Sequence, residues 1–129
     1  MGIQSDTFVF MSDNYSTLCG EVQSWLFLDF FSWRLKAQGV RVGRRESSHF
    51  AGGLYLDIQE GCHFTLERIT MRKYLAEADA DSNEKLHAAA TIVSRALAQL
   101  EIRHRFELYD SEDNLVNYLH HLWPQNASE

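Results

Sequence analysis

Hydrophobic and polar residues along this chain alternate with two different periods, one of a helix and one of a strand. Between residues 15 and 38 apolar side chains such as Leu18, Val22 and Trp33 recur at three- and four-residue spacings, and Gly39 follows as a stop. A second apolar row runs beside the first. This spacing is typical of a helix that is apolar around most of its circumference, so the segment predicts a long helix buried on two sides.

Alternation with a period of two predicts strands elsewhere. Leu54 and Leu56 share one face of a segment at 53–59, while Phe64 and Leu66 share one face of a segment at 62–69. Gly61 between these segments can adopt the positive φ of a hairpin turn, so the pair predicts a β-hairpin. The same pattern predicts further strands at 6–12, 40–46 and 102–109.

Two more helices are expected in the second half of the chain. Leu86, Val93 and Leu97 repeat at helical spacing in a segment at 82–100, where Asp81 and Glu84 fit a capping box. In a segment at 111–122, Asp110 is the expected N-cap, Leu115, Tyr118, Leu119 and Leu122 the expected apolar stripe, and Pro124 the stop.

These elements, in chain order, predict a single α+β domain over residues 1–129. We expect a mostly antiparallel sheet of four to five strands with two or three helices on one face. A ferredoxin-like topology is one arrangement with this composition of elements. Such folds support catalysis, regulation and inhibition, so the function must be argued from particular residues.

Composition and charge narrow the classes of partner. The chain is 45% hydrophobic and 23% charged, which is typical of a globular protein, and its net charge is −6. This charge opposes general binding to nucleic-acid phosphates and favours a protein partner with a basic surface. The N-terminal sequence lacks the features of a signal peptide, so a cytoplasmic location is expected.

The most unusual composition is that of residues 22–39, where two Trp and three Phe lie close together. The apolar run is interrupted by polar residues and is too short to span a bilayer, so no membrane insertion is expected. The aromatic side chains indicate either a wide contact with the core or a surface for a second protein, including a homodimer through this helix.

Metal and cofactor sites are not expected. Cys19 and Cys62 are isolated, and the six histidines form no ligand series. His120 and His121 would point about 100° apart on the predicted terminal helix, which disfavours joint chelation and indicates a helix-terminal feature.

Two clusters carry residue types that bind or transform small molecules. Arg41, Arg44, Arg45 and His49 form a positive patch near several glycines, which fits an anion site or a charged edge strand. His63 and Glu67 are an incomplete ligand or acid–base set on one face of a strand.

We therefore expect a non-catalytic protein-binding module, most specifically a small acidic bacterial inhibitor or immunity-type protein that blocks a basic partner. The alternative is a small hydrolase or anion-ligand-binding enzyme that uses His63, Glu67 and the Arg44/Arg45 patch. For the binding module, aromatic anchors and steering carboxylates form the expected contact surface. These residues are Glu77, Asp79, Tyr109, Asp110, Glu112, Asp113 and Trp123.

Overall fold

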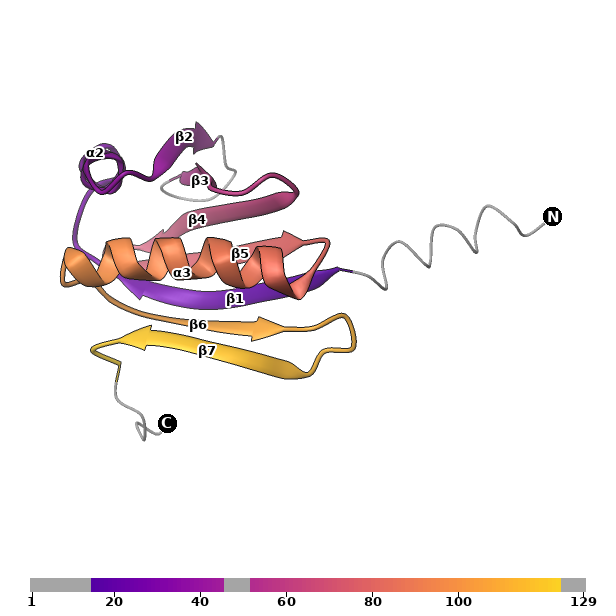
Figure 1. The fold of residues 1–129 in the computed structure, drawn as a ribbon. Helices are drawn as coiled ribbons and strands as arrows, with labels where there is room; N and C mark the ends of the chain where they lie inside the picture. The colour runs from indigo at the N-terminus through magenta and orange to yellow at the C-terminus, as the bar shows by residue number, and fades with distance from the viewer. Residues whose placement is uncertain (1–14, 46–51, 124–129) are drawn as a thin grey trace.

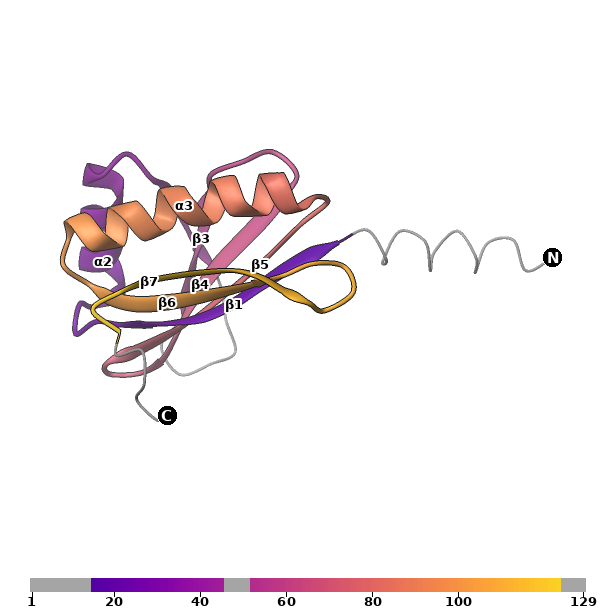
Figure 2. The same cartoon turned by 60° about the horizontal axis from the view of Figure 1, so that its bottom comes forward.

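The structure is a computed structural model that describes residues 15–45 and 52–123. Two helices cover one face of an antiparallel sheet of seven strands, as Figures 1 and 2 show. The α+β class and the helices on one face are confirmed. The sheet is larger than the four to five strands predicted, and its strand order does not show a ferredoxin-like topology. The strand predicted at 6–12 lies outside the described residues.

The order of strands across the sheet is β2-β3-β4-β5-β1-β6-β7, and every neighbouring pair is antiparallel. The first strand of the described residues therefore lies between two strands from the second half of the chain. β5, α3 and β6 form a split βαβ unit, because β1 pairs between the two strands that α3 connects. The strands are β1 (Ser16–Gln23), β2 (Arg41–Arg45), β3 (Gly53–Asp57), β4 (Cys62–Thr70), β5 (Lys73–Ala80), β6 (Arg103–Tyr109) and β7 (Leu115–His121). The helices are α2 (Leu28–Ala37) and α3 (Asn83–Gln99).

The helix predicted over 15–38 is wrong in its first half. Residues 16–23 form β1, and only residues 28–37 are helical. Leu18 and Val22 are four residues apart, which fits one turn of a helix but equally fits two steps along one face of a strand. Gly20 favours the strand, because a Cβ at this position would lie 2.2 Å from the carbonyl oxygen of Arg105 on β6.

The strand β5 was not predicted, because its buried face is built from residues that rarely signal a strand. Tyr74 is followed on that face by Ala76, Ala78 and Ala80, and alanine has a low strand propensity. α3 crosses this part of the sheet and presents its own small residues Ala89 and Ala90, which are fully buried. Small side chains on both elements let the helix approach the sheet closely.

The helix predicted at 111–122 is also wrong, since residues 115–121 form the edge strand β7. The capping signal at Asp110 is real, but it closes a hairpin. Oδ1 of Asp110 accepts hydrogen bonds from the backbone N–H groups of Glu112 and Asn114, both at 2.9 Å, and Asp113 adopts a φ of 65°. The same side-chain geometry begins either a helix or a turn.

The helix predicted at 82–100 is confirmed as α3, although a different residue caps it. Ser82 is the N-cap, and its hydroxyl accepts the backbone N–H of Lys85 at 3.2 Å. Asp81, the predicted cap, instead forms an ion pair with the Lys85 side chain at 3.1 Å. The strands predicted at 40–46, 53–59, 62–69 and 102–109 are confirmed to within one or two residues.

The core lies between the helices and one face of the sheet. Phe64 and Phe106 meet edge to face within it, with ring centroids 5.8 Å apart, and Phe31 of α2 packs on Tyr74 in the same way at 4.7 Å. Alternate residues of each central strand point to this core, so the intervening residues form the opposite face. No helix among residues 15–45 and 52–123 is long and apolar enough to cross a membrane.

Candidate functional site

The face of the sheet opposite the helices is polar at its centre, on β5, β1 and β6. Figure 1 shows these three strands side by side. Strand alternation places the odd-numbered residues of these three strands on this open face, since the even-numbered ones are buried under the helices. The register aligns Glu77 with Cys19 and Cys19 with Glu107 in one row across the strands. Two carboxylates and a thiol from three distant segments of the sequence are thereby brought into one row.

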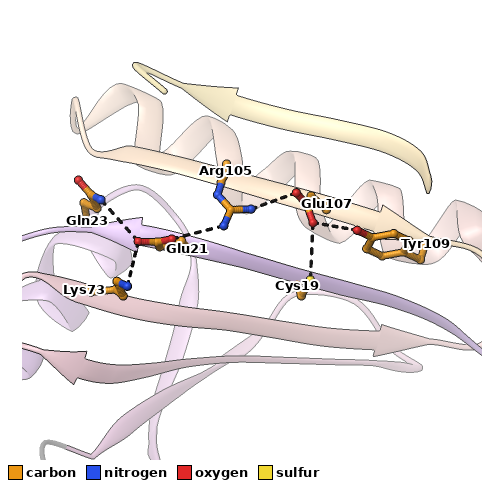
Figure 3. Close-up of polar contacts among 7 residues, drawn as sticks. All are labelled: Cys19, Glu21, Gln23, Lys73, Arg105, Glu107 and Tyr109. Atoms are coloured by element: carbon orange, nitrogen blue, oxygen red, sulfur yellow. Dashed lines mark hydrogen bonds and ion pairs between the residues drawn. The ribbon is translucent and has the colours of Figure 1, made fainter. Parts of the chain in front are cut away.

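A hydrogen-bonded network runs along β1 and β6 on this face, from Arg105 to Tyr109 (Figure 3). Arg105 connects two carboxylates, because one guanidinium nitrogen lies 3.0 Å from Glu107 and another lies 3.4 Å from Glu21. Lys73 approaches the second oxygen of Glu21 at 3.4 Å. The hydroxyl of Tyr109 donates to Glu107 at 2.8 Å. The negative charges of Glu21 and Glu107 are thus largely balanced within the protein.

Cys19 is exposed at the centre of this network, but it lacks the environment of a reactive cysteine. Its thiol lies 3.9 Å from Oε1 of Glu107. Partial burial raises the pKa of the Cys19 thiol, and the negative charges of Glu107 and Glu77 raise it further, although Arg105 opposes them. Reactive cysteines have a lowered pKa, so this residue is a protonated thiol near neutral pH.

Beyond the network, the open face becomes acidic towards the end where β5 and β6 finish. A groove of about 510 Å³ runs between β4, β5 and β1 there, and it is lined by Cys19, His63, Thr65, Glu77 and Asp79 among others. Nδ1 of His63 lies 3.2 Å from Oδ1 of Asp79. Glu77 has no ion pair with a described residue, so its charge is open to an incoming group.

The β6–β7 turn continues this acidic region at the same end of the sheet. It carries Asp110, Glu112 and Asp113, and neither Glu112 nor Asp113 forms an ion pair with a residue that the structure describes. Hydrogen bonds from backbone N–H groups lower the pKa of Asp110, which keeps its carboxylate charged. We call Glu77, Asp79, Asp110, Glu112 and Asp113 the acidic end.

Of the predicted aromatic anchors, one lies at the acidic end and one does not. Tyr109 is the last residue of β6 and leads directly into the acidic turn. Trp123 lies at the opposite end of the same strand, where its ring stacks against the guanidinium groups of Arg103 and Arg105 at 4.8 and 5.2 Å. Trp123 therefore covers the edge of the charged network and is separated from the acidic end by the length of β7.

The predicted anion site is only partly described. Arg41 is exposed and forms an ion pair with Asp57 on the neighbouring strand at 2.6 Å. Arg44 and Arg45 are the last residues of β2, but their side chains, like all of His49, lie outside the described part of the chain. The hollow of about 440 Å³ beside Arg41 is also lined by Asp57 and Glu60, which opposes anion binding there.

The second predicted pair, His63 and Glu67, is not brought together. Both residues lie on the open face of β4, but four positions along a strand separate their Cα atoms by roughly 13 Å. His63 faces Asp79, whereas Glu67 is aligned with Leu75. The structure therefore gives no joint acid–base or ligand pair from these two residues.

His120 and His121 lie on β7, so the helical geometry expected for them is wrong. As neighbours on a strand they point to opposite faces, and His120 stacks on Tyr118 while His121 stacks on the buried His104. Nδ1 of His104 donates to the backbone carbonyl of Ile102 at 2.9 Å, and Nε2 lies 2.7 Å from the hydroxyl of Ser94. Across residues 15–45 and 52–123, no group of three or more His, Cys, Asp or Glu side chains is placed to hold a metal ion.

The network around Glu21, Lys73, Arg105 and Glu107 was not anticipated from the sequence. Its residues come from β1, β5 and β6, and two of these strands had not been assigned as strands. The alternation of Lys73, Leu75, Glu77 and Asp79 with buried residues was the signal that could have placed them on one face.

No protein-family model, curated protein or solved structure matches this chain.

Proposed function

We propose that this protein is a non-catalytic protein-binding module of the small acidic inhibitor or immunity type, and that its acidic end docks on a basic surface of its partner. The observation that supports this proposal most is the meeting of five carboxylates at one end of the sheet. Glu77 and Asp79 come from β5, whereas Asp110, Glu112 and Asp113 come from a turn that lies thirty residues further along the chain.

The electrostatics of the acidic end favour a cationic partner. His63 beside Asp79 is the one described side chain that forms an ion pair with any of these five carboxylates. Elsewhere on the open face, Arg105 and Lys73 match the charges of Glu21 and Glu107. Charges that remain unmatched on a surface steer an oppositely charged protein and raise its rate of association.

Apolar anchors lie beside the acidic turn, as a stable interface requires. Leu115 and Val116 at the start of β7 are 56% and 43% exposed, and Tyr109 and Tyr118 lie on the strands that the turn connects. Protein interfaces place aromatic and aliphatic anchors inside a rim of charged residues. β7 is also an edge strand, so its outer backbone groups are available for pairing with a partner strand.

No specific geometry favours the hydrolase alternative among the residues that the structure describes. His63 and Glu67 are far apart, and Cys19 has a raised pKa. We therefore retain inhibition of a basic partner as the proposed function, with a cytoplasmic site of action in a bacterium as part of the proposal.

Affinity capture from the native source tests the proposal. The bait is the full chain, and the matched bait carries E77Q, D79N, D110N, E112Q and D113N. We expect these changes to preserve the fold, because Asn at position 110 keeps the accepting oxygen of the turn and Asn at position 113 tolerates the positive φ. Glu101→Gln, an exposed acid after α3, is the control at the other end of the molecule.

The proposal predicts that wild type and E101Q retain one basic protein in stoichiometric amount. The bait with all five substitutions, the five-fold variant, should lose this protein. The complex with wild type should block the activity of the captured protein. Equal capture by all three baits would contradict a role for the acidic end. A complex that leaves the partner fully active would contradict the inhibitory part of the proposal.

A further inference from the structure

A second surface, at the opposite end of the molecule from the acidic end, carries four large aromatic side chains in the open. Trp25, Phe27, Phe30 and Trp33 are 64%, 65%, 46% and 61% exposed. Phe31, in the same segment, is fully buried against Tyr74. We call the four exposed residues the aromatic surface. The segment thus divides its aromatic residues between the core and solvent.

Each ring of the aromatic surface is held by a stacking contact or by an arginine. Phe30 and Trp33 are stacked with centroids 5.7 Å apart, and the guanidinium of Arg34 lies 5.9 Å from the Phe30 ring. Arg72 covers Trp25 at 4.3 Å, and the buried Arg68 lies 5.1 Å from the ring of Phe27. These contacts restrict the rotamers, which lowers the entropy lost when the surface binds.

The area of this surface is sufficient for a small dimer interface. A Phe or Trp side chain presents about 150 to 250 Å², so the exposed fractions leave roughly 350 to 600 Å² of aromatic area on one copy. Two copies packed through the same surface would bury about 1,000 Å², which is near the lower limit of specific protein interfaces. A patch of this size matches the largest apolar patch of a typical monomer, and such patches are often functional.

The charges on α2 point to a second copy of this chain as that partner. Asp29 lies in the first turn of the helix and Lys36 in the last, and both are exposed. They are seven residues apart, so they lie on the same flank of the helix, beside the ridge formed by Phe30 and Trp33. When two such helices pack antiparallel about a two-fold axis, this flank of one helix faces the same flank of the other. The first turn of each helix then lies beside the last turn of its partner.

We propose that the protein forms a two-fold symmetric dimer in which α2 packs antiparallel against α2 of a second copy. Phe30 and Trp33 of both copies form the centre of the interface. Asp29 of each copy lies beside Lys36 of the other, which gives two equivalent ion pairs, and the two helix dipoles oppose each other favourably.

This dimer is compatible with the proposed function and independent of it. Figure 1 shows α2 at one end of the molecule and the β6–β7 turn at the other. The two acidic ends of the dimer therefore remain free for partners. Failure of either proposal leaves the other standing, because the residues that carry them do not overlap.

Sedimentation equilibrium of the full chain provides the first test, over protein concentrations from about 1 µM to about 1 mM, the range of dissociation constants expected for small interfaces. We expect a reversible monomer–dimer equilibrium. Trp33→Glu should weaken it at least tenfold, because it places two charges at the centre of the interface. Tyr55→Glu, which adds the same charge at an aromatic residue 49% exposed on β3, should leave it unchanged. A strict monomer up to the highest concentration would overturn the proposal.

The second test distinguishes antiparallel packing of α2 from any other contact. The D29K variant alone and the K36D variant alone each place like charges opposite one another at two positions, so each homodimer should be roughly 5- to 30-fold weaker than wild type. An equimolar mixture of D29K and K36D should form a heterodimer of near wild-type affinity, because both contacts are again between opposite charges. Formation of the heterodimer also shows that both variants are folded.

Homodimers that respond to W33E but show no preference for the mixed pair would overturn the antiparallel arrangement. The same samples are to be sedimented with vesicles of anionic phospholipid and of neutral phospholipid. A monomer that binds anionic vesicles through Trp33 would assign the aromatic surface to a lipid surface and overturn the dimer.

Discussion

Replacing Gly20 with alanine is expected to destabilise the protein, because β1 and β6 approach each other closely at this residue. A Cβ at position 20 would lie 2.2 Å from the carbonyl oxygen of Arg105 and 2.8 Å from Cδ1 of Phe106. The first contact is with backbone in the middle of the sheet, and the second is with a fully buried ring. Neither atom can move without disturbing its neighbours.

The magnitude follows from two opposing terms. Forcing a methyl group into a packed region costs about 1 to 3 kcal/mol, whereas alanine gains roughly 0.5 to 1 kcal/mol over glycine within regular structure. We expect a net loss of about 1 to 2 kcal/mol in the free energy of unfolding. If residues 15–38 were helical, as their apolar spacing alone predicts, the same change would stabilise the protein by about 1 kcal/mol. The two assignments therefore differ in the sign of the effect.

Urea denaturation followed by tryptophan fluorescence measures this difference, since the chain contains three Trp. The control is Gly43→Ala in β2, where the new Cβ would meet only the exposed side chain of Tyr55, which can rotate away. We expect G43A to have a midpoint near that of wild type and G20A a clearly lower midpoint with an unchanged slope. A G20A midpoint at or above wild type would refute the assignment of β1.

Three further outcomes are expected. Burial lowers the pKa of His104 below its ordinary value of 6.5, so acid protonates this residue in the unfolded chain before it does so in the folded protein. The free energy of unfolding should therefore be highest above about pH 6.5 and decline below it. Urea titrations between about pH 5 and pH 8 should show a smaller decline for His104→Gln. Alkylation of Cys19 by iodoacetamide at neutral pH should be slow and should accelerate in Glu107→Gln, since partial burial and then Glu107 raise the pKa of this thiol. Cys62 should react more slowly still, because burial raises its pKa to about 11. Peptide mass spectrometry after timed quenching measures the two sites separately. Treatment with a strong chelator should leave the melting temperature unchanged, and a large drop accompanied by stoichiometric zinc in the purified protein would contradict the expectation of no structural metal.

The sequence was most informative where one period of hydrophobicity fits one structure. α3 has apolar residues at helical spacing over four turns, and the hairpin of β3 and β4 alternates on both sides of Gly61. Over such lengths a helix pattern and a strand pattern do not coincide, so both elements could be predicted.

The sequence was ambiguous where one apolar spacing fits both a helix and a strand, and where tertiary packing requires residues of low strand propensity in a strand. Leu18 and Val22 fit either period, and the alanines of β5 are required by the approach of α3 rather than by strand propensity. Asp110 makes the hydrogen bonds of a helix cap but closes a turn, because the following residues pair with β6. In each case a distant segment decides the local structure.

The same limitation applies to the candidate site. The carboxylates of the acidic end could be identified from the sequence as acidic runs, but β5 and the turn after β6 reach the same end of the sheet only because β1 pairs between β5 and β6. The balanced network of Glu21, Arg105 and Glu107 depends on the same pairing. Sequence alone could not separate the matched carboxylates from the unmatched ones.

The rate of association with the captured partner tests the central proposal most directly. Stopped-flow or surface-based kinetics would compare wild type, the five-fold variant of the acidic end and E101Q at several salt concentrations. If the acidic end steers a basic partner, the five-fold variant should associate at least tenfold more slowly at low salt, and its rate should depend far less on salt, while its melting temperature stays close to that of wild type. E101Q should behave as wild type. An association rate and a salt dependence that are unchanged in the five-fold variant would contradict the proposal that the acidic end is the docking surface.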